Sequence, residues 1–258
     1  VSDGQQQAHT QIATGSSFEQ AWASGSALLE AWNAGQQQEI RWLRVDVVDE
    51  VMPCAWGELQ RRLSNNKRNY YRRGLAFDAG FNVAMLPQEL GAWAILYDAA
   101  TPVAIPNAGN LENYGKKRYG TPLSWPTDDE QTLWTFNIRG LFADASGIWP
   151  IENQGRHHGY RRVENWPGPQ LPEVITRASH YLAGEINAGG DFNYGWFPCF
   201  DRPIPSTNAL RHASSTYALL EGWEVTQDPQ HLAAIERALG HLCSDLIRTL
   251  RLPDGSDA

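Results

Sequence analysis

The residues that could carry chemistry gather in one stretch, where an aromatic loop leads into an apolar helix. Asp191 and Asp201 flank the run FNYGWFPCF, and Glu221 and Glu224 follow within the helix. If the loop folds back, these carboxylates can face a common cleft. Glycosidic cleavage uses a carboxyl pair in an aromatic pocket, one as proton donor and the other as base or nucleophile. Asp201, Asp191 and Glu221 are therefore candidate acid/base residues.

Arg211 and His212 lie in the first turns of this helix, where the N-terminal partial charge favours bound anions. Arg211 could hold a carboxylate through two hydrogen bonds, which makes it a candidate substrate-binding residue. His212 is a further catalytic candidate, because the unperturbed pKa of histidine is about 6.5. Structural roles are the alternatives: Asp201 paired with Arg202, Asp191 capping a turn, and His212 packed on the helix.

Ring and amide side chains in the same stretch are typical of a sugar-binding surface. Tyr194, Trp196 and Phe197 are candidate stacking residues, because flat aromatic faces pack on sugar rings. Asn208 stands where the helix should begin and is a strong N-cap type, so it could cap the helix and also contact substrate. The sequence thus predicts a concave small-molecule or sugar site without naming the substrate.

A second polar group lies in the N-terminal part. Glu152 and His157 are expected to line a cleft between the two parts of the chain, as additional substrate-binding residues. His157 and His158 are adjacent, so in a strand they point to opposite faces and cannot easily share a metal ion. We therefore expect no metal and no cofactor.

The cysteines offer a third kind of chemistry. Cys54 follows Pro53 at an expected helix start, where a thiolate would be stabilised, so peptide or amide chemistry through Cys54 or Cys199 is a further hypothesis. The three cysteines lie far apart and match no metal or redox spacing. The sequence contains no phosphate-binding glycine motif and no GxSxG motif.

Composition narrows the class of protein. Of 258 residues, 42% are apolar and 19% charged, which is typical of a folded chain. The 21 basic and 29 acidic residues give a formal net charge of −8, which argues against nucleic-acid and anionic-membrane partners. No apolar run approaches the roughly 20 residues of a spanning helix. The chain begins at Val1, so we expect a mature periplasmic or secreted protein, with a cytoplasmic location left open.

The N-terminal part should be α+β. Residues 1–16 are polar and Gln-rich and should form a disordered leader, and residues 17–165 an α+β domain. Expected helices and strands follow from hydrophobic spacing. They are a helix over 18–34 ending at Gly35, a strand over 40–51, a helix from Pro53 to about Arg73 with a basic face, short runs over 81–86 and 92–97, an irregular connection over 99–125, and strands over 132–142 and 148–163.

The C-terminal part should be helical. WPGPQLP marks a boundary at residue 166, so residues 166–258 form the second domain. Helices are expected over 173–187, 208–226 and 229–250. Asp228 and Pro229 suit a cap and the first helical position, so the last two helices should form a hairpin.

The segment NALRHASSTYALLEGWEVTQDPQHLAAIERALGHL resembles the helical hairpins of (α/α)-barrel carbohydrate-active enzymes. The resemblance covers at most residues 173–250 and implies a toroid whose inner helices surround a cleft lined by aromatic residues and carboxylates. The group includes glycoside hydrolases, polysaccharide lyases and sugar epimerases. No signature in this segment assigns a catalytic residue.

A complete toroid needs more hairpins than this chain contains. Either a further polypeptide segment or subunit completes the helical domain, or the helices pack on the N-terminal sheet in another architecture. The expected function is glycoside hydrolysis of a polysaccharide or oligosaccharide. The alternatives are a non-catalytic glycan-binding or assembly module of a larger exported complex, and a polysaccharide lyase or sugar epimerase.

Overall fold

Helices and an antiparallel sheet account for most of the chain, which is 40% helical and 20% strand. The computed structural model describes residues 1–3, 8–35, 39–153, 158–162, 166–197, 199–200, 202–248 and 251–254. The chain divides into two units, Val1–Arg162 and Val163–Ala258, which are described separately. The expected mixed α and β composition is confirmed, whereas the toroid remains a prediction.

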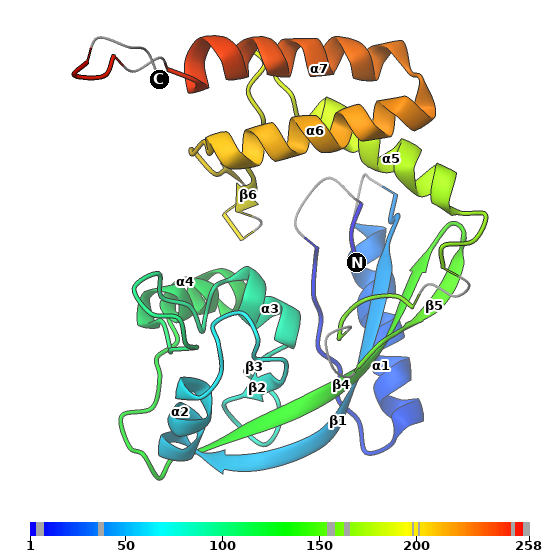
Figure 1. Cartoon of the computed structure of the whole chain (residues 1–258). Coiled ribbons are helices and arrows are strands. Elements are labelled where there is room, and N and C mark those ends of the chain that lie inside the picture. The colour runs from blue at the N-terminus through cyan, green and yellow to red at the C-terminus, as the bar shows by residue number, and fades with distance from the viewer. Residues whose placement is uncertain are drawn as a thin grey trace. The chain divides into compact units, whose positions relative to one another are not determined.

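The first unit is organised by a long antiparallel pair of strands, β1 (Leu43–Ala55) and β4 (Thr132–Asp144) (Figure 1). Their register runs from Leu43 opposite Ala143 to Ala55 opposite Thr132, with an irregularity between Asp49 and Met52. On the edge away from β1, β4 pairs with β2 (Gly74–Ala76) and with β5 (Gly147–Ile151). The strand β3 (Ala84–Met85) pairs with β2 and extends the sheet.

The described residues of the first unit also form the helices α1 (Phe18–Ala34), α2 (Trp56–Ser64), α3 (Pro87–Ala92) and α4 (Ala108–Tyr119). A buried cluster of Ala76, Ala84, Phe136 and Ile138 lies on the sheet. The described part of the expected leader contacts this unit, because Ile12 packs against the cluster and Ser2 pairs with Trp42. The disordered leader expected over residues 1–16 stays a prediction.

The strand expected over 148–163 ends at Ile151 as β5. Two further expected elements of the first unit are also wrong. The strand β1 continues through Pro53 to Ala55, because Cys54 pairs with Leu133 of β4, and the following helix ends at Ser64 instead of near Arg73. The connection expected over 99–125 contains helix α4, which begins after the N-cap Asn107. In both places a cap or a distant strand outweighed local composition.

The expected basic face is mostly used within the chain. On α2, Arg61 and Arg62 pair with Glu58. Arg68, which lies beyond the helix, donates hydrogen bonds to the backbone carbonyls of Asp98, Ala99 and Thr101. These contacts favour a structural role for the basic residues of α2 and the segment after it.

The described part of the second unit contains the helices α5 (Leu171–Gly184), α6 (Ala209–Thr226) and α7 (Pro229–His241), with a π-helical turn at Leu242–Leu246. A short hairpin, β6 (Trp196–Phe197) and β7 (Arg202–Pro203), interrupts the long connection between α5 and α6. The hairpin expected between the last two helices is confirmed, because the Asp228 side chain accepts from the Gln230 backbone N–H at the start of α7.

The three helices pack around Ile186, Leu219, Ala234, Ile235 and Ala238. At Gly222 a side chain would collide with Ser179, so α5 and α6 approach closely there. No helix in the described part of the chain combines the length and the apolar character that crossing a lipid bilayer requires.

Candidate functional site

The loop that follows α5 fixes the position of Asp191. The Asn187 side-chain oxygen accepts hydrogen bonds from the backbone N–H groups of Gly189 (2.9 Å) and Asp191 (3.2 Å). Gly190 has φ +89°, and a Cβ atom there would overlap the backbone carbonyl of Arg237 and crowd His241. The loop therefore lies directly against α7, and glycine at 190 permits that approach.

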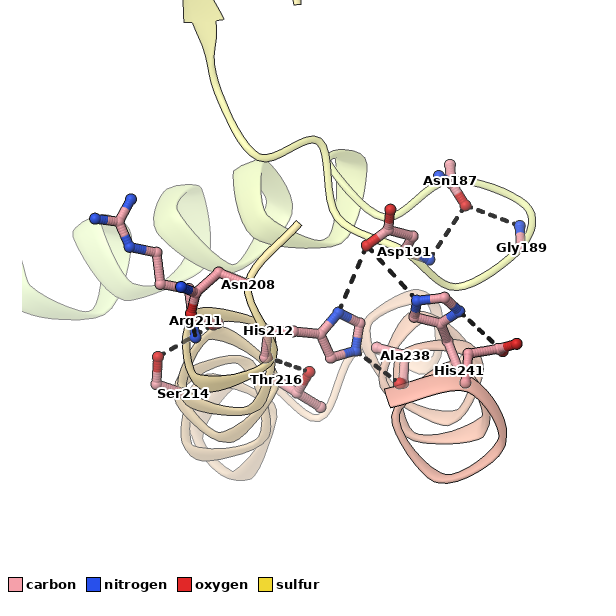
Figure 2. A network of polar contacts seen from close by, with 11 residues as sticks. Asn187, Gly189, Asp191, Asn208, Arg211, His212, Ser214, Thr216, Ala238 and His241 are labelled. Atoms are coloured by element: carbon pink, nitrogen blue, oxygen red, sulfur yellow. Dashed lines mark hydrogen bonds and ion pairs between the residues drawn. The ribbon is translucent and has the colours of Figure 1, made fainter. Parts of the chain in front are cut away.

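Two histidines from neighbouring helices meet Asp191 (Figure 2). His212 lies in the first turns of α6, and His241 is the last residue of α7. Asp191 Oδ1 lies 3.9 Å from His212 Nδ1 and 3.7 Å from His241 Nε2. One donor atom from each residue lies within 4.8 Å of the others, so the three form a compact cluster.

The other nitrogen of each ring is engaged on the outer side of the cluster. His212 Nε2 lies 2.9 Å from the carbonyl oxygen of Ala238, which can only accept, so this nitrogen carries the proton. His241 Nδ1 lies 3.1 Å from a carboxylate oxygen of Asp245 and donates to it. In the neutral rings, His212 Nδ1 and His241 Nε2 therefore carry no proton and have a lone pair available. Both nitrogens face the Asp191 carboxylate.

Three acceptors that face one another need a positive charge between them. His212 Nδ1 is buried and has no hydrogen-bond partner among the described residues. The distances of 3.7 and 3.9 Å to Asp191 exceed the roughly 2.7–2.9 Å of a charge-assisted N–H···O bond. In tetrahedral zinc with bonds of about 2.0–2.1 Å, ligand atoms lie about 3.3 Å apart, so small side-chain movements would complete such a site.

The cluster is buried on one side and accessible on the other. The His212 side chain is 3% exposed, whereas Asp191 is 32% exposed. Phe192 packs edge-on against the His212 ring, with ring centres 5.1 Å apart. An ion held by these three residues would therefore be anchored in the helical core and reachable at the Asp191 side.

A second group of the same residue types lies at the other end of α7. His231 Nε2 lies 3.1 Å from His180 Nδ1, and Thr226 Oγ1 lies 3.0 Å from His231 Nδ1. Asp228 Oδ2 is 3.9 Å from a nitrogen of each ring. Here both nitrogens of the buried His231 ring can be hydrogen-bonded without a metal ion. The Thr226 hydroxyl donates to His231 Nδ1, and His231 Nε2 donates to His180 Nδ1.

The structure separates Arg211 from the cluster. The guanidinium of Arg211 lies 5.0 Å from the centre of the Tyr194 ring and points away from His212 (Figure 2). The Asn208 side chain accepts from the Arg211 backbone N–H at 3.0 Å, so the expected N-cap is confirmed. Arg211, Tyr194 and Asn208 thus lie at the start of α6 but outside the Asp191–His212 contact.

The remaining described candidates are not part of the cluster of Asp191, His212 and His241. Glu221 is nine residues beyond His212 on α6, about half a turn past two full turns, and it is exposed beside Tyr217. Trp196 (54% exposed) and Phe197 lie in the β6–β7 hairpin. Glu152 belongs to the first unit, 4.0 Å from Arg162. Asp201 and His157 lie outside the described residues.

The nucleophilic cysteine hypothesis is not supported at Cys54. This residue lies on a strand and not at a helix start, and it is 5% exposed. Burial raises the pKa of its thiol, so the reactive thiolate is disfavoured. Cys199 is also buried.

Sequence reasoning included Asp191 and His212 and missed His241. The signal was present in the hairpin itself. Antiparallel helices joined at Gln227–Asp228 place the first turns of α6 beside the last turn of α7, and His212 and His241 stand at roughly equal distances from that turn. Asp245, which orients His241, was also missed; a hydrogen bond from Ser244 and the neighbouring His241 lower the pKa of its carboxyl.

Comparison of the chain with protein-family models, with curated proteins and with solved structures finds no match, so its function is inferred from the geometry of the site.

Proposed function

We propose that the helical unit binds one divalent transition-metal ion through Asp191, His212 and His241, and that the ion activates water for hydrolysis. One observation carries this proposal: the buried Nδ1 of His212 has no hydrogen-bond partner among the described residues and faces both Asp191 and His241. Two imidazole nitrogens and one carboxylate suit zinc, and also ferrous iron.

The contacts outside the cluster support a metal site. Histidines that bind metals almost always donate their second ring N–H to a carboxylate or a backbone carbonyl. His241 does the first with Asp245, and His212 does the second with Ala238. These bonds fix the ring orientations and leave the inner nitrogens as lone pairs.

The described residues offer three protein ligands, and that number points to catalysis. Structural zinc sites have four protein ligands, whereas catalytic ones have three and keep a position for water or substrate. Bound zinc lowers the pKa of its water to about 7, which supplies hydroxide near neutral pH. The exposed side of Asp191 gives water and substrate a route to that position.

This proposal departs from the expectation of a metal-free site. That expectation considered the adjacent pair His157 and His158, because no other histidines are close in sequence. The two histidines proposed here are 29 residues apart along the chain and come together only through the helical hairpin.

A zinc titration of the chelator-treated protein tests the proposal. We expect one zinc ion per chain, measured by competition with a chromophoric chelator, and we expect Asp191→Asn, His212→Gln and His241→Gln each to weaken binding at least about 100-fold. Cobalt substitution adds a direct readout, because its visible absorption reports the coordination number. The matched control is His180→Gln, which changes the second His–Asp group and should leave zinc affinity unchanged.

Other outcomes would contradict parts of the proposal. The alternative cation is a proton on one imidazole; in that case zinc would not bind, and the three variants would alter only stability. Zinc bound equally by the wild type and by all three variants would place the ion elsewhere. For the hydrolytic step, the zinc-loaded protein should cleave 4-nitrophenyl acetate faster than His241→Gln, and equal rates would limit the function to binding.

Carbohydrate binding is the second candidate, favoured by the exposed rings of the β6–β7 hairpin. Trp196 and Phe200 are exposed, and Arg202 lies over the rings of Phe197 and Phe200. Such a surface suits stacking against sugar rings. Calorimetry with oligosaccharides beside a reducing-sugar assay separates a glycoside hydrolase from a glycan-binding module, and Trp196→Ala should abolish binding in either case.

A further inference from the structure

We propose that a cavity in the first unit binds a small carboxylate with an apolar body, independently of the metal site in the second unit. The cavity is about 230 Å³ and lies between the segment after α2 and the helix α3 with the loop that follows it. Its walls combine an apolar floor with a cationic and polar rim.

The floor is formed by buried aliphatic side chains. Leu90 of α3 and Leu96 and Ala104 of the following loop are all nearly inaccessible to solvent. An engineered apolar cavity of about 150 Å³ holds benzene, so this one has room for a ring or short chain and a carboxylate. It is smaller than the roughly 300–1,000 Å³ typical of sites for drug-sized ligands, so the ligand is small.

The rim is positive. Arg72 lines the cavity and donates through Nη1 to the backbone carbonyls of Asn69 and Tyr71, and its Nη2 and Nε make no hydrogen bond to the described residues. The guanidinium of Arg68 lies over the ring of Tyr97, 5.0 Å from its centre, and Tyr97 is also a lining residue. No described lining residue carries a carboxylate. An anion is therefore attracted by this rim, and a carboxylate matches the planar fork of arginine.

The backbone around the cavity is held in an uncommon conformation. Asn69 and Ala94 both line it, and their φ angles are +71° and +51°. This left-handed region is sterically disfavoured for residues that carry a Cβ, and asparagine tolerates it more readily than alanine. Such residues often accompany ligand sites, and here both shape the cavity mouth.

One glycine allows the cavity to be filled without disturbing its surroundings. Gly91 of α3 lines the cavity, and a Cβ atom there meets no atom within 4 Å. Gly91 is itself exposed, so Gly91→Leu adds a bulky side chain at a lining position without a clash, and we expect it to exclude the ligand. Gly184, at the end of α5 in the second unit, is equally unobstructed, so Gly184→Leu is the matched control.

The test is fluorine NMR on the full chain with 4-fluorobenzoate, with 4-fluorobenzyl alcohol as the neutral counterpart. We expect saturable binding of fluorobenzoate to the wild type and to Gly184→Leu, and none to Gly91→Leu. Arg72→Gln should lower the affinity for 4-fluorobenzoate at least about tenfold, and it should leave the weaker affinity for the alcohol unchanged. Thermal unfolding of each variant verifies that it is folded.

Three results would overturn the proposal. They are absence of saturable fluorobenzoate binding to the wild type, retained binding in a folded Gly91→Leu variant, and equal affinity for the alcohol and the carboxylate. Because none of these measurements involves zinc or the second unit, they do not depend on the metal proposal.

Discussion

A cluster of two histidines and one aspartate lies at each end of helix α7, but the two clusters differ in whether the buried histidine nitrogens have hydrogen-bond partners. At its C-terminal end, His241 meets His212 and Asp191, and the inner nitrogen of His212 has no hydrogen-bond partner in the described part of the chain. At its N-terminal end, His231 meets His180 and Asp228, and its two nitrogens are both within hydrogen-bond distance of a partner. If only the proximity of histidine and aspartate were considered, the two clusters would be equally good candidates for a metal site.

The difference comes from the partners on the outer side of each ring. Ala238 and Asp245 are acceptors, so they take the protons of His212 and His241 outward and leave three acceptors facing inward. Thr226 is a hydroxyl that can donate, so it allows His231 to direct its own proton inward to His180. The cluster at the C-terminal end of α7 thus needs a cation, whereas the one at the N-terminal end is complete without it.

The largest expected effect concerns the loop that holds Asp191 against α7. Gly190→Ala introduces a Cβ that collides with the Arg237 carbonyl, at a left-handed backbone position. We expect unfolding by denaturant to show a loss of about 2–4 kcal/mol, together with loss of zinc binding.

Gly240→Ala is the matched control, since Gly240 lies in α7 and a Cβ there meets no atom within 4 Å. Alanine in a helix interior is more favourable than glycine by roughly 0.5–1 kcal/mol, so this variant should be slightly more stable. Equal stability of the two variants would show that the loop does not approach α7 as described.

The next effect is the response to zinc and its removal. At free zinc of about 100 times the dissociation constant, the wild type should gain about 2.7 kcal/mol, seen as a rise of roughly 5–10 °C in the thermal midpoint that EDTA reverses. His241→Gln should abolish the rise and His180→Gln should retain it. A rise lost equally in both variants would erase the distinction between the clusters.

Local signals in the sequence predicted much of the second unit. Asn208 and the Asp228–Pro229 pair are capping signals that act within three residues, and they correctly placed the starts of α6 and α7. They failed at Pro53, where pairing of Cys54 with Leu133, 79 positions away, extends a strand into an expected helix. Pairing across such a separation leaves no local pattern.

Only those residues of the candidate metal site that lie in one sequence segment could be predicted. Asp191 and His212 belong to the loop and helix that were singled out, and the structure brings them together. The expected partnership with Glu221 did not account for helical phase, which places that residue on the opposite side of α6 from His212. His241 required the hairpin geometry, and the proton directions required the outer partners, neither of which spacing reveals.

A smaller effect is expected when the N-terminal cluster is broken. His231→Leu leaves the Thr226 hydroxyl and His180 without their partner, and His231 is 0% exposed. We expect a loss of about 1–3 kcal/mol in the free energy of unfolding, with zinc affinity and stoichiometry unchanged. A fall in zinc stoichiometry would instead make this group a second metal site. His180→Gln, at a side chain 52% exposed, should cost less.

The smallest effect concerns the carboxylate that orients His241. Asp245 is largely exposed and touches the metal site only through His241, so Asp245→Ala should weaken zinc roughly tenfold and leave stability nearly unchanged. Asp245→Asn should fall between that variant and the wild type, because an amide oxygen still accepts from Nδ1 but carries no charge. Glu236→Gln, an exposed acid on the same helix, is the control. If Glu236→Gln weakens zinc as much as Asp245→Ala, net charge rather than ring orientation is responsible, and the contrast between the ends of α7 loses its physical basis.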